Sequence, residues 1–138
     1  MSQTNLDLIK AKCAERHDNT LLKSLGIEII EISKNSVTGK MPIDARTHQI
    51  YGYLHGGASV AFAETLCSIG AAANIDVTKQ KALGMEINAN HLRVMESGWV
   101  QGEAKPIHLG KKTQIWEIKI TDDENKLVCI SRCTMVIV

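Results

Sequence analysis

The sequence predicts an α+β fold in which a curved antiparallel sheet wraps around one long, buried helix. Two observations predict it. Residues 58–75 form an apolar, alanine-rich stretch of helical length, and after Leu83 the chain changes to the alternating pattern of strands. Because these strands follow one another with only turns between them, the sheet should be antiparallel. A helix that is apolar on nearly all faces should be buried against that sheet.

The segment before the long helix should form two short helices and a hairpin. Apolar residues recur at helical spacing after a Thr-Asn pair that can serve as the N-cap. A second, shorter helical stretch ends at Gly26, which suits the left-handed conformation of a helix C-terminus. β-branched residues then favour two strands joined by a turn at Lys34-Asn35. The expected elements are helices over residues 6–13 and 20–25 and strands over residues 26–34 and 36–43.

The segment after the hairpin should form a glycine-rich loop over residues 48–57, then the long helix, then four strands. A turn of four polar residues, 122–125, separates the last two strands. One curved sheet around one helix leaves a flank open, so we expect self-association to close it. The four strands are expected over residues 83–94, 98–108, 111–121 and 126–138.

Length and composition restrict the function. We expect one domain over residues 1–138, with residues 1–25 as an N-terminal helical segment. The net charge of +1 and the lack of a basic run argue against a nucleic-acid surface. No uninterrupted apolar stretch reaches the roughly 18 residues of a membrane span, and the polar start Met1–Asn5 lacks a signal-peptide core. We therefore expect a cytoplasmic protein that binds neither nucleic acid nor membrane.

The four cysteines are expected to be free thiols. Cys129 and Cys133 lie four positions apart in an expected strand, which separates them by roughly 13 Å. That separation is too long for a disulfide. The five histidines form neither HExxH nor a cluster with the cysteines, so we expect no zinc site.

A single acid, Glu64, lies in the otherwise apolar long helix. Burying an unpaired carboxylate costs several kcal/mol unless a polar group meets it. Ser68 follows four positions later on the same face, where it could orient the acid or share a water with it. The alternative is that Glu64 reaches the rim of the helix and stays solvated. The helix alone leaves both interpretations open.

The tripeptide His55-Gly56-Gly57 directly precedes this helix. Glycines let the backbone approach a ligand closely, and a helix N-terminus presents unpaired N–H groups with a favourable dipole. Such N–H groups can stabilise the oxyanion that forms when an acyl carbonyl is attacked. The alternative is a plain turn into the helix.

Three stretches of the chain resemble the hotdog-fold thioesterases. The first runs from Gln49 to Ser59 and continues to Ala63-Glu64 and Ser68, and the others are residues 84–93 and 105–110. The resemblance is to the phenylacetate type, close to the dihydroxynaphthoyl-CoA and enterobactin proofreading thioesterases. It spans nearly the whole chain, excluding only the N-terminal helix. It implies a hotdog fold paired into dimers, usually a dimer of dimers, with the active site at the dimer interface.

The resemblance also implies a role for each residue. Glu64 would be the nucleophile or the general base, and Gly56 would donate its N–H to the thioester oxygen. Gln49 and His55 would position the thioester or the leaving sulfur, and Ser68 would help to hold water. No metal or cofactor is implied. The residues implied to bind the substrate and its coenzyme A are Gly57, His91, Arg93, His108, Gly110 and Lys111.

The expected function is therefore hydrolysis of acyl-CoA thioesters. The resemblance favours aromatic or ring-containing acyl groups, with dihydroxynaphthoyl-CoA of menaquinone synthesis as a candidate. Two alternatives stay open because fold does not fix function. One is an acyl dehydratase or hydratase that uses His55 and Glu64, and the other is an acyl-CoA-binding module without catalysis. No GxSxG elbow or nucleotide-binding glycine motif is present.

Overall fold

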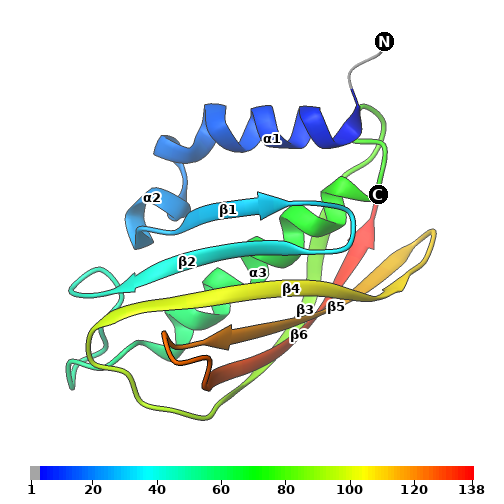
Figure 1. The fold of residues 1–138 in the computed structure, drawn as a ribbon. Coiled ribbons are helices and arrows are strands. Elements are labelled where there is room, and N and C mark those ends of the chain that lie inside the picture. Colours follow the sequence, from blue (N-terminus) through cyan, green and yellow to red (C-terminus); the bar gives the residue numbers. More distant parts are fainter. Residues whose placement is uncertain (1–3) are drawn as a thin grey trace.

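The computed structural model describes residues 4–138, and it has the predicted α+β architecture (Figure 1). One six-stranded antiparallel sheet, in the order β1-β2-β4-β5-β6-β3, curves around helix α3. Each expected helix and strand is present, and Met1–Gln3 lie outside the described residues. The helices are α1 (Asn5–Arg16), the 3-10 helix η1 (His17–Asn19), α2 (Leu21–Leu25) and α3 (Gly56–Ala73), and the strands are β1 (Glu28–Ile32), β2 (Val37–Ile43), β3 (Ala82–His91), β4 (Gly98–Leu109), β5 (Thr113–Thr121) and β6 (Leu127–Ile137).

The two N-terminal helices end as the sequence indicates. Thr4 is the N-cap of α1, and its side chain and that of Asp7 form a reciprocal capping box. Gly26 closes α2 in the left-handed region, with φ of 73°. Helix α1 lies over β1, outside the sheet and the central helix (Figure 1). It packs inward through Ile9, which is buried.

Both prolines lie where the sheet tolerates a missing N–H. Pro42 in β2 pairs with Trp99 of β4, but the β1 ladder has already ended at Lys40, so no strand needs the missing donor on that side. Pro106 lies at the register shift of the β4–β5 pair, which falls between Pro106 and His108. The sheet therefore accommodates both prolines without losing a ladder hydrogen bond in the middle of a regular strand pair.

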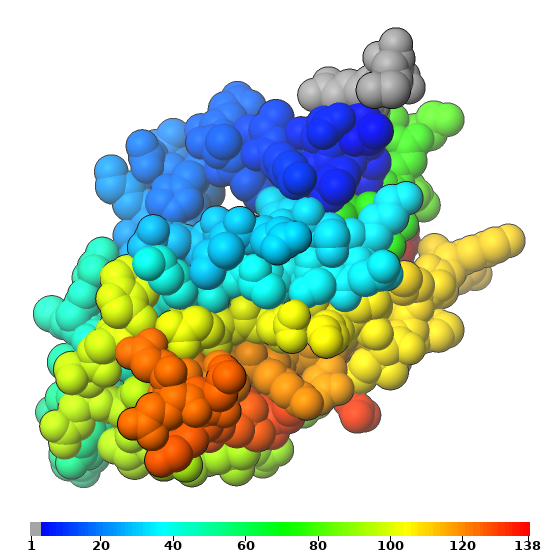
Figure 2. Space-filling view, in the orientation of Figure 1, coloured from blue at the N-terminus to red at the C-terminus, as the bar shows by residue number. Residues whose placement is uncertain are grey.

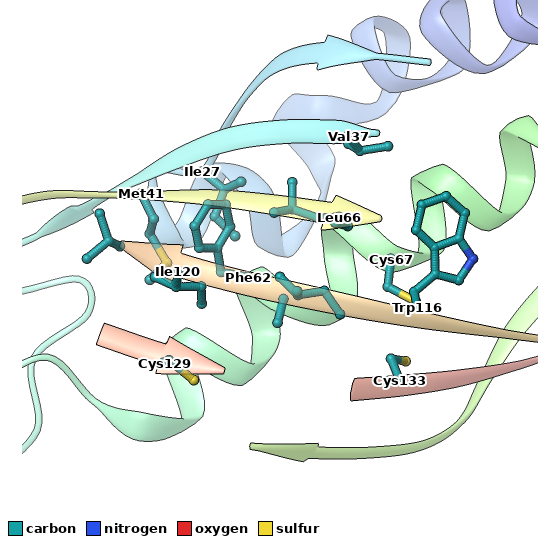
Figure 3. Close-up of a cluster of buried hydrophobic side chains, with 14 of the residues drawn as sticks. Ile27, Val37, Met41, Phe62, Leu66, Cys67, Trp116, Ile120, Cys129 and Cys133 are labelled. Atoms are coloured by element: carbon teal, nitrogen blue, oxygen red, sulfur yellow. The ribbon is translucent and has the colours of Figure 1, made fainter. Parts of the chain in front are cut away.

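The core lies between the concave face of the sheet and α3 (Figure 3). Phe62 and Leu66 of α3 are completely buried. Opposite them, a Cβ at Gly102 of β4 would lie 2.7 Å from Leu66 and 2.8 Å from Phe62. Trp116 of β5 is also completely buried, and its ring fills the space that a side chain at Gly70 would need. The absence of side chains at these two glycines therefore lets the helix and the sheet approach closely.

Replacing Gly70 with alanine should destabilise the protein by about 1–3 kcal/mol. The new Cβ would lie 2.5 Å from Cη2 and 2.7 Å from Cζ3 of Trp116, neither of which has free space to move into. Helix propensity alone would make alanine more stable than glycine by about 1 kcal/mol. A lower free energy of unfolding must therefore come from the collision with Trp116. Urea unfolding measures it. A free energy of unfolding equal to or above that of the unchanged protein would contradict the packing argument.

Helix α3 is long and apolar enough to cross a membrane by length and composition alone, but half of its residues are buried inside the molecule. That burial is typical of the central helix of a folded domain. All four cysteines are free thiols, as predicted, and three of them are buried in the core: Cys67, Cys129 and Cys133.

Candidate active site

Glu64 lies on α3 and its side chain turns toward β3. Its carboxylate contacts the backbone of Gly84, where an added Cβ would lie 3.2 Å from Cδ of Glu64. The β3–β6 register shifts between Gly84 and Glu86, and such bulges are frequent beside active sites. Glu64 is half-buried. The acid is therefore held against an edge strand while it still reaches a cleft.

That cleft has a volume of about 590 Å³ and lies between α3 and the N-terminal helices. Glu64 and Ser68 both line it, as their i,i+4 spacing predicts. The opposite wall comes from α1, η1 and α2. The remaining lining residues are Lys12, Cys13, Arg16, His17, Thr20, Leu21, Leu22, Ala61, Thr65 and Ile69.

The N-terminus of α3 leaves one N–H group unused. His55 is the N-cap, and its Nδ1 accepts a hydrogen bond of 2.8 Å from the Gly57 N–H. The N–H groups of Ala58 and Ser59 both donate to the carbonyl of His55. Among the described residues 4–138, the Gly56 N–H has no hydrogen-bond partner. It is thus free for a ligand at the positive end of the helix dipole. The helix also begins two residues earlier than predicted, because this cap satisfies its first turn.

Gly56 opens onto a second cleft, of about 350 Å³. Gln49, His91 and Arg93 line the same cleft. The imidazole of His91 is so close to Gly56 that a Cβ there would lie 2.9 Å from Nε2. The structure therefore brings together four of the residues singled out in the sequence, three of which are polar.

Other predicted site residues lie elsewhere. Within one chain, Glu64 and Ser68 do not share a cleft with Gly56. Beside the His48–Gly52 turn, His55 lines a shallow hollow with Gln49, and Gly57 is exposed next to it. The hairpin between β4 and β5 carries the last three, His108, Gly110 and Lys111. One chain thus presents the predicted site in four separate parts.

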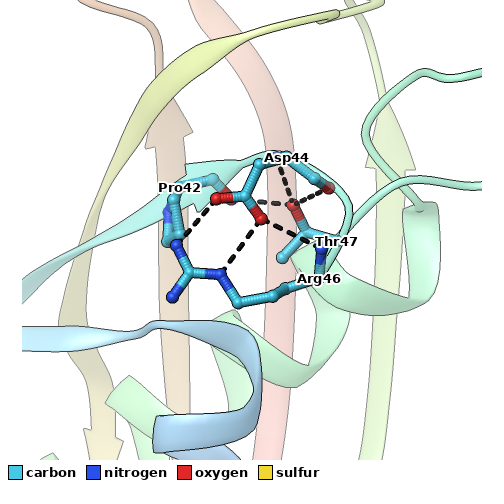
Figure 4. Close-up of polar contacts among 4 residues, drawn as sticks. All are labelled: Pro42, Asp44, Arg46 and Thr47. Atoms are coloured by element: carbon cyan, nitrogen blue, oxygen red, sulfur yellow. Dashed lines mark hydrogen bonds and ion pairs between the residues drawn. The ribbon is translucent and has the colours of Figure 1, made fainter.

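The turn before Gln49 holds the segment that leads to Gly56 (Figure 4). The hydroxyl of buried Thr47 donates to the carbonyl of Pro42 at 2.7 Å and accepts from the Asp44 N–H at 3.2 Å. The Thr47 carbonyl in turn accepts from the His55 N–H at 2.8 Å. Hydrogen bonds from Arg46 lower the pKa of Asp44 to about 2. The turn therefore anchors the N-cap of α3.

Replacing Thr47 with valine should lower the free energy of unfolding by about 1–3 kcal/mol. The substitution keeps the shape but leaves the Pro42 carbonyl and the Asp44 N–H without their partner. Serine keeps the hydroxyl, so Thr47→Ser is the matched control and should lose much less. Thermal and urea unfolding compare the two variants. A free energy of unfolding for Thr47→Val equal to that of the unchanged protein would show that the hydroxyl contributes nothing.

Cys67 lies one helical turn beyond Glu64 but is unsuited to nucleophilic attack. A hydrogen bond with Cys133, burial and the negative charge of Glu64 all raise its pKa above that of an ordinary thiol. A raised pKa keeps the sulfur protonated and unreactive. Glu64 is therefore the acid or base that this part of α3 can offer.

Two features of the site were not predicted from the sequence. One is the contact of Glu64 with Gly84, although a glycine inside a strand pattern is a known sign of close approach. The other is the wall that α1 and α2 build beside Glu64. No local pattern could have predicted it, because it depends on how α1 docks on α3.

Comparison with known proteins agrees with this architecture. The sequence profile of the Thioesterase superfamily matches residues 51–129. The chain is 48% identical over 117 residues to the 1,4-dihydroxy-2-naphthoyl-CoA hydrolase of Listeria monocytogenes, covering 85% of this chain and 94% of the relative. It is 44% identical over 117 residues to the proofreading thioesterase EntH of Klebsiella pneumoniae, covering 83% of each chain.

A solved structure extends the similarity to the whole fold. The crystal structure of a mutant thioesterase from Pseudomonas aeruginosa has 39% sequence identity and a TM-score of 0.88, and it covers 99% of this chain and 96% of its own. The predicted hotdog fold and the predicted family are confirmed. The chain therefore belongs to the thioesterase superfamily and is an enzyme that hydrolyses thioesters.

Proposed function

We propose that the chain hydrolyses acyl-CoA thioesters with aromatic or ring-containing acyl groups, using Gly56 and Glu64 as the reacting pair. The observation that carries the proposal is the free N–H of Gly56 at the N-terminus of the same helix that holds Glu64 in a cleft. The relative from L. monocytogenes makes 1,4-dihydroxy-2-naphthoyl-CoA the first substrate to test.

The reaction needs an oxyanion donor and an activated nucleophile. The carbonyl oxygen of the thioester accepts a hydrogen bond from the Gly56 N–H, which stabilises the negative charge that develops on attack. Glu64 either removes a proton from the attacking water or itself forms an acyl anhydride that water then cleaves. In both routes the C–S bond breaks, the free acid is released, and the coenzyme A thiolate takes up a proton. Ser68, which lines the same cleft, would hold the water.

Two copies of the chain would bring the pair together. Strand β3 is an edge of the sheet, and its apolar side chains Leu83 and Met85 are 50% and 58% exposed. An exposed apolar edge is suited to pairing with an identical edge. Two-fold antiparallel pairing of β3 would bring the His91 end of one copy against the Gly84 end of the other. Gly56 of one copy would then approach Glu64 of the other.

The same pairing supports the proposed coenzyme A site. His91 and Arg93 lie in the cleft of Gly56. The β4–β5 hairpin with His108, Gly110 and Lys111 lies at the opposite end of the sheet, the end where β3 begins. Pairing would join these two groups across the interface, where their positive charges suit the phosphates of coenzyme A. We propose a homodimer on this basis, with a dimer of dimers as the larger assembly, and a cytoplasmic location in keeping with the four free thiols.

The state of His55 favours hydrolysis over the dehydratase alternative. Its Nδ1 accepts the Gly57 N–H, so the neutral ring carries its proton on Nε2. A ring in that state donates to a thioester and cannot remove a proton from an acyl chain. The binding-module alternative gives no role to an acid held in a cleft beside Gly84.

A panel of acyl-CoA thioesters tests the proposal. Release of free thiol is followed for 1,4-dihydroxy-2-naphthoyl-CoA, benzoyl-CoA and straight-chain acyl-CoAs, and scored as kcat/KM. We expect the ring-containing substrates to rank first. A 3-hydroxyacyl-CoA that loses water without releasing thiol would instead establish the dehydratase. Tight binding without thiol release or dehydration of any substrate would establish the binding module.

A further inference from the structure

The cleft beside Glu64 has a wall that lies outside the residues matched by the superfamily profile. Residues 51–129, which match the superfamily, already contain Gly56 and Glu64, whereas α1 lies outside them. The relative from L. monocytogenes is matched over 94% of its length by 85% of this chain, so part of this chain has no counterpart there. The superfamily profile thus contains both reacting groups but not α1, and α1 supplies a surface that faces Glu64.

The space beneath this added layer is open. Helices α1 and α2 meet the core only in part, and Figure 2 shows a gap between them and β1. Cys13, His17 and Leu22 line both the cleft beside Glu64 and a second hollow on the β1 side. A volume of about 590 Å³ is within the range of small-molecule sites. The cleft can therefore accept a group of the size of a ring or a medium acyl chain.

The wall of this cleft combines apolar residues with two cations. Leu21, Leu22 and Ile69 supply apolar surface. Lys12 and Arg16 lie on the same face of α1, four positions apart, and both line the cleft. Among the ion pairs of residues 4–138, neither cation has a carboxylate within 4.0 Å.

This placement is unfavourable for the helix itself. Like charges at i,i+4 destabilise a helix by a few tenths of a kcal/mol. The helix dipole favours Arg16 in the last turn, but it gives no reason for both cations to share the face that meets the cleft. An anionic ligand in the cleft gives that reason, because it would offset the repulsion between the two side chains.

We propose that this cleft is the acyl subsite and that Lys12 and Arg16 select acyl groups that carry a carboxylate of their own. The inference rests on the thioesterase function proposed above. The apolar wall packs the body of the acyl group, and the two cations bind its carboxylate through charge-assisted hydrogen bonds. Glu64, on the opposite wall, meets the thioester carbon. A neutral acyl group of the same size would lack the contact with Lys12 and Arg16.

Two matched pairs of substrates test the proposal: hexanoyl-CoA with adipoyl-CoA, and benzoyl-CoA with 4-carboxybenzoyl-CoA. For each pair the ratio of kcat/KM, carboxylated over neutral, is measured by thiol release. We expect a ratio of about ten or more in the unchanged protein and below about two in Lys12→Met/Arg16→Met. The swapped variant Lys12→Arg/Arg16→Lys keeps both charges and should keep the ratio. Lys23→Met removes an exposed charge of α2 away from the cleft and is the control.

Each remaining outcome overturns the inference. A ratio near one in the unchanged protein, with rapid hydrolysis of both members, overturns it and leaves the thioesterase function standing. No hydrolysis of any acyl-CoA overturns both. If the methionine variant loses activity equally on both members and binds free coenzyme A more weakly as an inhibitor, the cations bind coenzyme A phosphates and the inference is wrong.

Discussion

Replacing Glu64 with glutamine should lower kcat on the best acyl-CoA substrate by about 10²- to 10⁴-fold. The amide has the shape of the acid and can keep the position beside Gly84. It cannot accept a proton from water or attack a carbonyl carbon. Because the substrate contacts lie elsewhere, KM should change by less than about threefold, and the loss falls on kcat and kcat/KM alike. Steady-state thiol release measures both constants.

The control for this variant is Glu28→Gln, which removes an exposed carboxylate of β1. It should leave kcat unchanged. Thermal unfolding and gel filtration of both variants establish that the fold and the assembly persist. A loss of less than tenfold in Glu64→Gln would show that the acid does not take part in the reaction.

Replacing Gly84 with alanine should lower kcat by about 100-fold through the position of Glu64. The added Cβ would occupy the place of the Glu64 carboxylate and would lie 3.2 Å from its Cδ, so the side chain must swing away. A displacement of about 1 Å can reduce turnover by about 100-fold. Gly84 is exposed on an edge strand, so alanine should not unfold the protein.

A double-mutant cycle separates this mechanism from damage to the strand. If Gly84→Ala acts through Glu64, it should lower kcat no further in a protein that already carries Glu64→Gln. Gel filtration checks that β3 still supports the assembly of the unchanged protein. If kcat of the double variant is well below kcat of Glu64→Gln, Gly84 contributes in another way. If Gly84→Ala keeps full activity, the carboxylate acts from a different position.

The fold could be predicted because its elements have clear periods. The strand from Thr113 to Thr121 alternates strictly, and the apolar run of α3 is too long for a strand. The sequence predicts that α3 starts at Ala58, two residues later than it does, because glycines are poor helix formers. The cap from His55 outweighs that preference.

The site could be predicted only where it depends on local spacing. Glu64 and Ser68 share a cleft because they lie one turn apart on one helix. Gly56 and His91 lie far apart in the sequence. The resemblance to thioesterases implied a role for each of them, but neither it nor the pattern of residues predicted their contact. The contact of Glu64 with Gly84 and the wall from α1 depend on tertiary packing, for which a single sequence carries no periodic signal.

The close approach between α3 and the sheet has a consequence for turnover. Phe62 and Leu66 fit against Gly102, and Trp116 fits against Gly70, so α3 can neither rotate about its axis nor slide along it without a collision. Glu64 lies on the same helix. The contacts between α3 and the sheet therefore fix the direction in which its side chain leaves the helix. Larger side chains at Gly102, which is buried in the core, would turn the carboxylate out of alignment, and catalytic precision in this enzyme is therefore a property of its interior.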